Sequence, residues 1–373
     1  MKKYLATTAL VTLIAGSAMA SDLTAKIGGS VDFEMGKISQ KKDYRTDLTP
    51  NQKNFKMRNR SHIFVSAEGS AENGMTYGAN AKISGTAEQN TAFSNGKVDK
   101  TYLWVESKAG RVELGSNFAV SKLMAVGAES IASATGGASD GNWIDYTNFG
   151  NGVLQELSSY FYNGDSISTN TTYGKEGDRK ISWMSPRYSD FQFGVSYSPD
   201  LANNGSNNNN NNNISVKNAF SFALNYTGIR NDMNIAASLT HDMGKVTTAN
   251  TKNLAATKVG LAIGKNGITV AGSYGTDGKS SMTQGETGYT SKFYTAGVAY
   301  ENGPMTSSLT YLNRKTNSSI SKAKLTSYAL GLDYKLAAGL KTFAEVTAFK
   351  AEDAAKTTKN SGTVVLLGSK IGF

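Results

Sequence analysis

The sequence predicts an all-β fold, namely a transmembrane antiparallel β-barrel of about sixteen strands. Segments of alternating apolar and polar residues recur along the chain, and tight turns alternate with long polar segments between them. After residue 20, no apolar run reaches the roughly 20 residues that a membrane-spanning helix needs. The mean hydropathy of −0.36 excludes spanning helices but not barrels, because only alternate residues of a transmembrane strand face lipid.

The first twenty residues have the pattern of a secretory signal peptide. Lys2 and Lys3 precede an apolar stretch over residues 4–15, and Ala18-Met19-Ala20 forms a small-x-small cleavage site. A membrane anchor is the alternative, but this apolar run is too short to span a bilayer. We therefore expect a cleaved signal peptide over residues 1–20 and one barrel domain over residues 21–373.

Composition narrows the choice of function. The chain has 39 Gly, 18 Tyr and 15 Phe but only 4 Pro, which favours strands and turns over long helices. It has no Cys, so disulfides and thiolate metal sites are excluded. The net charge of +10, or +8 without Lys2 and Lys3, is scattered over strand ends and loops. Without a basic patch or an aromatic platform, nucleic-acid binding is not expected.

Both ends of the predicted barrel show two-faced strands. In residues 23–34 the odd positions are apolar or small and the even positions are small, polar or charged. The last segment, 363–373, places Val365, Leu367, Ile371 and Phe373 on one face and Lys370 on the other. In a barrel the apolar face meets lipid and the polar face lines a wet lumen.

The connections between strands alternate in length. Short turns are expected at 72–74, 109–110, 186–190, 228–232, 265–267, 301–304 and 336–339. Long polar segments lie at 37–56, 89–97, 118–178, 200–216, 242–255, 275–290, 314–323 and 351–362. Short periplasmic turns on one rim and long extracellular loops on the other are typical of outer-membrane barrels with an even strand number.

Several short motifs resemble one family. The ending Ile371-Gly372-Phe373 resembles the C-terminal signal that the barrel assembly machinery reads, with Ile371 and Phe373 as its key residues. The segments 72–78, 109–115, 183–188 and 191–197 are similar to the tight turns and hairpins of alpha-proteobacterial porins, in the same order and spacing. The chain thus resembles the Gram-negative general (non-specific) porins.

This resemblance implies a homotrimer of sixteen-stranded barrels in the bacterial outer membrane. Each barrel would be a water-filled channel for passive diffusion of small hydrophilic solutes and ions, narrowed by a third loop folded inward. That loop would run from 118 to about 160, with Gly136-Gly137 giving it freedom to fold back. Its acids, the candidates for the pore constriction, are Glu129, Asp140, Asp145 and Glu156. The wording of the loop departs from that of enterobacterial porins.

Bases on the barrel wall would face these acids. If Ile63, Val65 and Ala67 face lipid, then Arg58, Arg60 and His62 have the opposite parity and point inward or at the rim. Lys26, Lys82 and Arg111 complete the predicted basic wall. Opposing walls of charge would orient dipolar solutes and exclude apolar ones.

Other interpretations stay open or are disfavoured by the residues. His62 and His241 lie in no catalytic motif, so an enzyme is not expected. No cofactor is expected, although the loop carboxylates leave calcium possible. A substrate-specific channel would need an aromatic track from Trp104, Trp143 and Trp183, and a surface adhesin would use the long loops. If trimers form, the small or flat outer positions Ala25, Gly29 and Leu367 would carry the contact.

Overall fold

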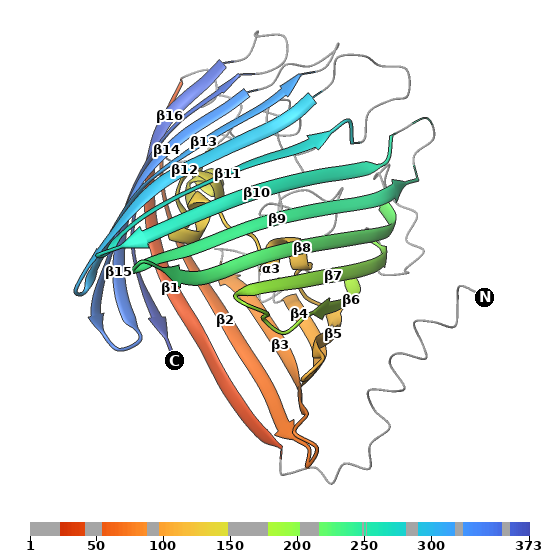
Figure 1. The fold of residues 1–373 in the computed structure, drawn as a ribbon. Coiled ribbons are helices and arrows are strands. Elements are labelled where there is room, and N and C mark those ends of the chain that lie inside the picture. Colours follow the sequence, from red (N-terminus) through yellow and green to blue (C-terminus); the bar gives the residue numbers. More distant parts are fainter. Residues whose placement is uncertain are drawn as a thin grey trace.

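The computed structural model confirms a closed antiparallel barrel of sixteen strands (Figure 1). It describes residues 23–41, 54–87, 97–147, 178–201, 216–247, 250, 252–280, 290–317, 324–352 and 359–373. Residues 1–20, the expected signal peptide, and Glu156 of the expected constriction lie outside the described residues. Each strand pairs with its neighbours in sequence, and β1 pairs with β16, so the sheet has no free edge.

The strand bounds agree with the predicted order. They are β1 (Thr24–Gln40), β2 (Phe55–Ser70), β3 (Thr76–Ala87), β4 (Lys97–Ser107), β5 (Gly110–Ser116), β6 (Arg179–Met184), β7 (Phe191–Asp200), β8 (Val216–Arg230), β9 (Met233–Val246), β10 (Leu254–Lys265), β11 (Ile268–Gly278), β12 (Thr290–Asn302), β13 (Met305–Asn317), β14 (Lys324–Ala337), β15 (Leu340–Glu352) and β16 (Lys359–Gly372).

All seven predicted short turns join neighbouring strands at one rim of the barrel. The turn between β10 and β11 shows why its residues suit it, because Asn266 and Gly267 have φ of 52° and 79°. Two successive residues with positive φ give the turn whose twist matches that of a hairpin. At the other rim the predicted loop starts were wrong by a few residues. Strands β1, β9 and β11 continue to Gln40, Val246 and Gly278, since polar residues keep the ladder beyond the lipid zone.

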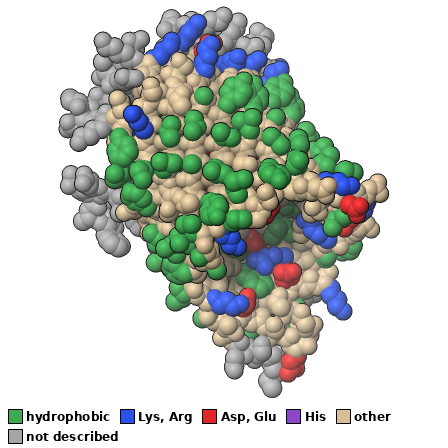
Figure 2. Space-filling model, turned by 90° about the vertical axis from the view of Figure 1, so that its left-hand side faces the viewer, with side chains coloured by type: hydrophobic (Ala, Val, Ile, Leu, Met, Phe, Trp, Pro, Cys, Tyr) green, Lys and Arg blue, Asp and Glu red, His purple; other side chains and the backbone are tan. Residues whose placement is uncertain are grey.

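The outer face of the barrel is apolar, as Figure 2 shows over one side of the molecule. Side chains such as Ile27, Val31 and Leu330 have exposed fractions of 74%, 50% and 56%. Aromatic residues pair across neighbouring strands on this face at Phe191–Tyr226, Tyr197–Phe220, Tyr274–Tyr294 and Tyr311–Tyr328, with ring centroids 4.9–5.1 Å apart. These rings and the aliphatic side chains form the apolar outer surface that a barrel turns to lipid.

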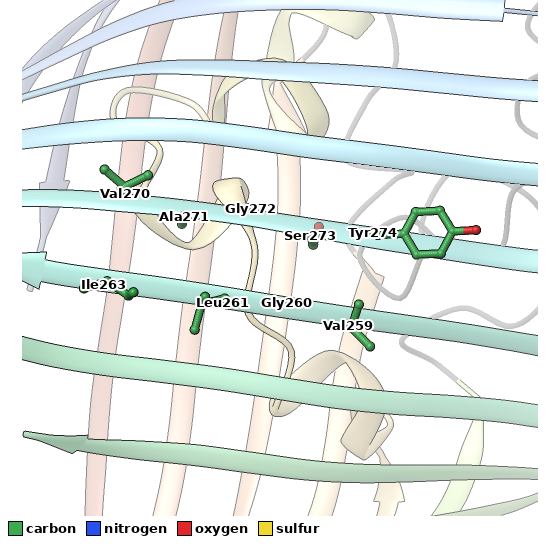
Figure 3. Close-up of a pocket in the computed structure, with 9 residues that line it drawn as sticks. All are labelled: Val259, Gly260, Leu261, Ile263, Val270, Ala271, Gly272, Ser273 and Tyr274. Carbon is green, nitrogen blue, oxygen red and sulfur yellow. The ribbon is translucent and has the colours of Figure 1, made fainter. Parts of the chain in front are cut away.

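Figure 3 shows the alternation on two neighbouring strands. Val259, Leu261 and Ile263 of β10 and Val270 and Tyr274 of β11 line a shallow groove of about 510 Å³ on the outer face. Ala271 and Ser273, which alternate with Val270 and Tyr274 on β11, face inward, where a segment of the chain passes behind the two strands. The described helices have four or five residues each, and none is long and apolar enough to cross a membrane.

A charged side chain on the apolar outer face is expected to destabilise the barrel, because it would face lipid. Leu330 lies on β14 between the outward-facing Tyr328 and Tyr334, so Leu330→Arg is expected to reduce the free energy of unfolding by about 2–4 kcal/mol. Asn80→Arg, on the lumen side of β3, is the control and is expected to cost less than about 0.5 kcal/mol. Urea unfolding of the protein in lipid vesicles measures both; equal losses would contradict the assignment of faces.

Candidate functional site

A long segment between β5 and β6 folds into the barrel, as expected for the third loop. Its described part, residues 117–147, contains α3 (Val120–Leu123), η1 (Ala128–Ile131), α4 (Gly137–Asp140) and η2 (Asn142–Tyr146). In order, these four elements contact β6 to β9, β11 to β13, β13 to β15, and finally β16 and β1. The loop therefore follows the inner wall around the barrel, and Figure 1 shows its short coils within the ring of strands.

Hydroxyl groups on the wall hold the backbone of this loop. They accept hydrogen bonds from loop N–H groups at Ser196 (from Val120, 3.0 Å), Ser221 (from Ser121, 3.1 Å), Ser238 (from Val126, 2.9 Å), Thr295 (from Ala128, 3.3 Å), Ser308 (from Ser133, 2.7 Å) and Thr310 (from Ala138, 2.9 Å). The hydroxyl of Ser327 donates to the carbonyl of Ala138 at 2.8 Å. An irregular segment inside a barrel needs such partners, because its N–H groups find none in a strand ladder.

Glycines on the wall let the loop approach this closely. A Cβ atom at Gly260 would lie 1.7 Å from the carbonyl oxygen of Val126, and one at Gly331 would lie 2.8 Å from that of Ser133. A Cβ at Gly194 would meet the side chains of Met124 and Val120 at 2.7–2.9 Å. Larger residues at these wall positions would push the loop toward the centre of the lumen.

The end of the described loop is fixed by a buried cluster on β1 and β16. Trp143 and Tyr146 pack with Ile38 and Leu366, all at most 7% exposed. Beneath them the fully buried carboxylate of Glu34 accepts hydrogen bonds from Tyr146 Oη at 2.9 Å and Asn142 Nδ2 at 2.7 Å. Burial, together with the charge of Glu34, raises the pKa of the Tyr146 phenol, so this group stays protonated and donates.

The predicted loop acids lie in different environments. Asp145 accepts from Arg58 at 2.5 Å, and its backbone carbonyl lies 3.5 Å from Lys56 Nζ. Asp140 has a side chain 46% exposed and lies 3.8 Å from Lys122 Nζ. Glu129 instead turns to the wall, where it forms an ion pair with Lys258 at 2.6 Å and is only 10% exposed. Glu129 therefore clamps the loop and does not reach the open lumen.

Two of the predicted wall bases meet the loop. Arg58 contacts Asp145, while Arg60 bonds to Asp32 at 3.1 Å, to Glu34 at 3.4 Å and to Asn142 at 2.8 Å.

The other predicted bases lie elsewhere on the lumen side. Lys26 pairs with Glu68 near the rim with short turns, and Lys82 lies opposite Lys100. Arg111 bonds to Glu113 at 2.8 Å and stacks over Trp104 at 4.3 Å. The imidazole of His62 lies 2.7 Å from the hydroxyl of Ser84.

Sequence reasoning missed two parts of the site. Glu34 was on the predicted lumen face of the first strand, so its parity carried a usable signal. Lys100 and Lys122 approach the ring of Phe118 at 3.3 and 5.8 Å, at the start of the loop. Lys122 belongs to the loop itself, and no period in the sequence indicated where its side chain would lie.

The geometry gives little support to an aromatic track, a catalytic site that uses histidine, or a calcium site, which the sequence had raised as alternatives. Trp104 faces the lumen, Trp143 of the loop is buried against the wall, and Trp183 lies on the outer face, so the three do not form one track. His62 lies on the lumen side and His241 on the outer side, so they cannot share a catalytic site. Among the described residues, no three Asp, Glu, His or Cys side chains gather as metal ligands for calcium.

The family model described as Gram-negative porin matches residues 6–354. The chain belongs to this family. It is 27% identical to a protein of Rickettsia prowazekii (strain Madrid E), over 95% of this chain and 93% of the relative. It is also 27% identical to a protein of Rickettsia felis, over the whole length of both chains. Both relatives are named only as uncharacterised proteins.

Solved structures with the same fold include mutants of the Rh. blastica porin. Two of them have TM-scores of 0.59 at 17% identity, over 94% of this chain and all of the other. Together with the closed barrel, the family match makes this porin an integral protein of the outer membrane that forms a channel for passive diffusion. The rim with the short turns is accordingly the periplasmic rim.

The hydrogen bonds by which Glu34 holds the end of the described loop, here called the Glu34 clamp, can be tested. Glu34→Gln removes the anionic acceptor of Tyr146, Asn142 and Arg60, so the loop end should loosen. We expect a loss of about 1–3 kcal/mol in the free energy of unfolding and a noisier open-channel current. Glu68→Gln, which breaks the exposed pair with Lys26, is the control and should cost less than about 1 kcal/mol. Thermal unfolding and single-channel recording measure both, and a quiet, fully stable Glu34→Gln would refute the clamp.

Proposed function

We propose that this porin is a general channel for small hydrophilic solutes and ions. It selects them by size and by the electric field across its narrowest point. The observation that carries the proposal is the meeting of the clamped loop with the basic wall, at Asp145 with Arg58 and Lys56. The Asp145 and Arg58 side chains are 44% and 21% exposed, so their charges face water. Opposite charges at a constriction turn dipolar solutes and disfavour apolar ones.

The remaining parts of the proposal rest on sequence and family. The lysines and apolar run of residues 1–20 support export through a cleaved signal peptide. The outward position of Ile371 and Phe373 supports recognition by the barrel assembly machinery. Membership of the porin family supports a homotrimer, with Ala25, Gly29 and Leu367 on the outer faces of adjoining strands.

A planar-bilayer recording of the refolded mature protein tests this function. We expect stepwise conductance in potassium chloride, in groups of three where trimers insert, and reversal potentials that report the ion selectivity. A barrel that unfolds only on heating yet stays electrically silent would overturn the channel and favour a surface-contact role for the long loops.

The charge pair at the constriction makes a signed prediction. Asp145→Asn should shift the reversal potential toward anion selectivity, and Arg58→Gln should shift it toward cation selectivity, each changing the permeability ratio by about twofold. Glu352→Gln, whose carboxylate pairs with Lys350 at the extracellular end of β15, is the control and should change the ratio little. Shifts of the same sign in the two constriction variants would contradict the assignment.

A further inference from the structure

Three lysines stand side by side at the periplasmic end of the lumen. Lys335 of β14 lies directly opposite Lys341 of β15, and Lys341 lies directly opposite Lys370 of β16. All three have the parity of lumen-facing residues, since the same register pairs Phe343 with Asp333 and Gly368. Like charges directly opposite each other in a sheet destabilise it. This row is therefore a cost to the barrel that an anion between the ammonium groups would relieve.

The row borders a cavity. A hollow of about 440 Å³ lies at this rim, lined by the three lysines, by Glu301 and Asp333, and by the turns of Gly303-Pro304 and Gly339. Figure 2, which looks at this side of the molecule, shows Lys and Arg side chains gathered with a few acidic ones around an opening into the barrel. The volume is large enough for a small polyanion with its nearest waters.

The acids nearby are mostly engaged. Asp333 bonds to Lys341 Nζ at 2.9 Å and accepts the N–H of the loop residue Ala134 at 3.2 Å. Asp32, which lies opposite Lys370 on β1, bonds to Arg60. Within the part of the chain that the structure describes, Lys335 and Lys370 have no carboxylate at ion-pair distance. Of the two carboxylates that line the cavity, Asp333 is bonded to Lys341, so the ammonium groups of Lys335 and Lys370 share the cavity with Glu301.

We propose that Lys335, Lys341 and Lys370 form a binding site for a small multivalent phosphate anion, such as pyrophosphate, at the periplasmic mouth of the pore. An ammonium group binds phosphate as a compact point charge with three donors, and three of them match an anion with several charged oxygens. A monovalent anion would engage fewer of them. The site lies inside the lumen at one end only, so its effect on transport has a direction. It goes beyond the proposed function and does not require that the channel conduct.

Isothermal titration of pyrophosphate into the refolded full-length mature barrel in detergent tests the binding itself. We expect saturable binding that weakens about tenfold in the double variant Lys335→Gln/Lys370→Gln, because two charged donors are lost. Glu301→Gln should tighten binding, since it removes one of the two carboxylates that line the cavity. Lys265→Gln is the matched control: Lys265 lies at the same rim on the outer face and bonds to the carbonyl of Asn231, and its removal should change affinity less than twofold.

A planar-bilayer recording shows from which side of the membrane the anion reaches the site. Pyrophosphate added on the periplasmic side should reduce the potassium chloride current at lower concentration than the same anion added on the other side, and the double variant should abolish this difference. The site is refuted if the wild type binds no pyrophosphate, if the double variant binds within twofold of it, or if Lys265→Gln loses affinity equally. Titration that succeeds in a silent barrel would refute the channel and leave the site standing.

Discussion

The whole structure depends on one constraint, that every backbone N–H and C=O group within the hydrocarbon must have a partner inside the protein. The barrel meets it by joining β1 to β16 as well as to β2, so no strand has an open edge. Closure needs apolar side chains only on the outward half of each strand, and the inward half is free to be polar. This explains how a chain with a mean hydropathy of −0.36 can span a membrane. Because neighbouring strands are antiparallel, the connections alternate between the two rims, and the even strand number places both ends of the barrel at the rim with the short turns.

The polar inner wall is what makes an inward loop possible. An irregular segment cannot pair its N–H groups with itself, and the lumen-facing Ser and Thr hydroxyls of β7, β8, β9, β12 and β13 accept them instead. Because Gly260 and Gly331 have no Cβ atom, the loop backbone can lie close to the wall at these two positions. Because the described part of the loop is hydrogen-bonded to so many strands, the fold of the wall sets its position in the lumen.

The sequence predicted what has a local period and missed what depends on distant partners. Strand parity placed Arg58 and Arg60 in the lumen and Ile371 and Phe373 on the lipid side, because a period of two fixes the face of each side chain. Tight turns were located to within a few residues, since their Asn and Gly positions require positive φ. The environment of Glu129 was out of reach, because its partner Lys258 lies 129 residues away and no pattern links them. Strand ends were placed too early where polar residues continue the ladder above the lipid.

The two ion pairs of the loop differ in their exposure to water, and under the proposed function only the exposed pair acts on solutes. The pair of Glu129 and Lys258 is 10% and 3% exposed, so its charges neutralise each other at short range and fasten the loop. The pair of Asp145 and Arg58 is 44% and 21% exposed, so its field extends into the water of the pore. The total charge of +10 counts both pairs equally and therefore cannot give the selectivity. Under the proposed function, the selectivity follows from partly exposed groups such as Arg58 on β2 and Asp145 on η2, and the buried carboxylate of Glu34 holds the neighbouring Asn142 and Tyr146 of η2 in place.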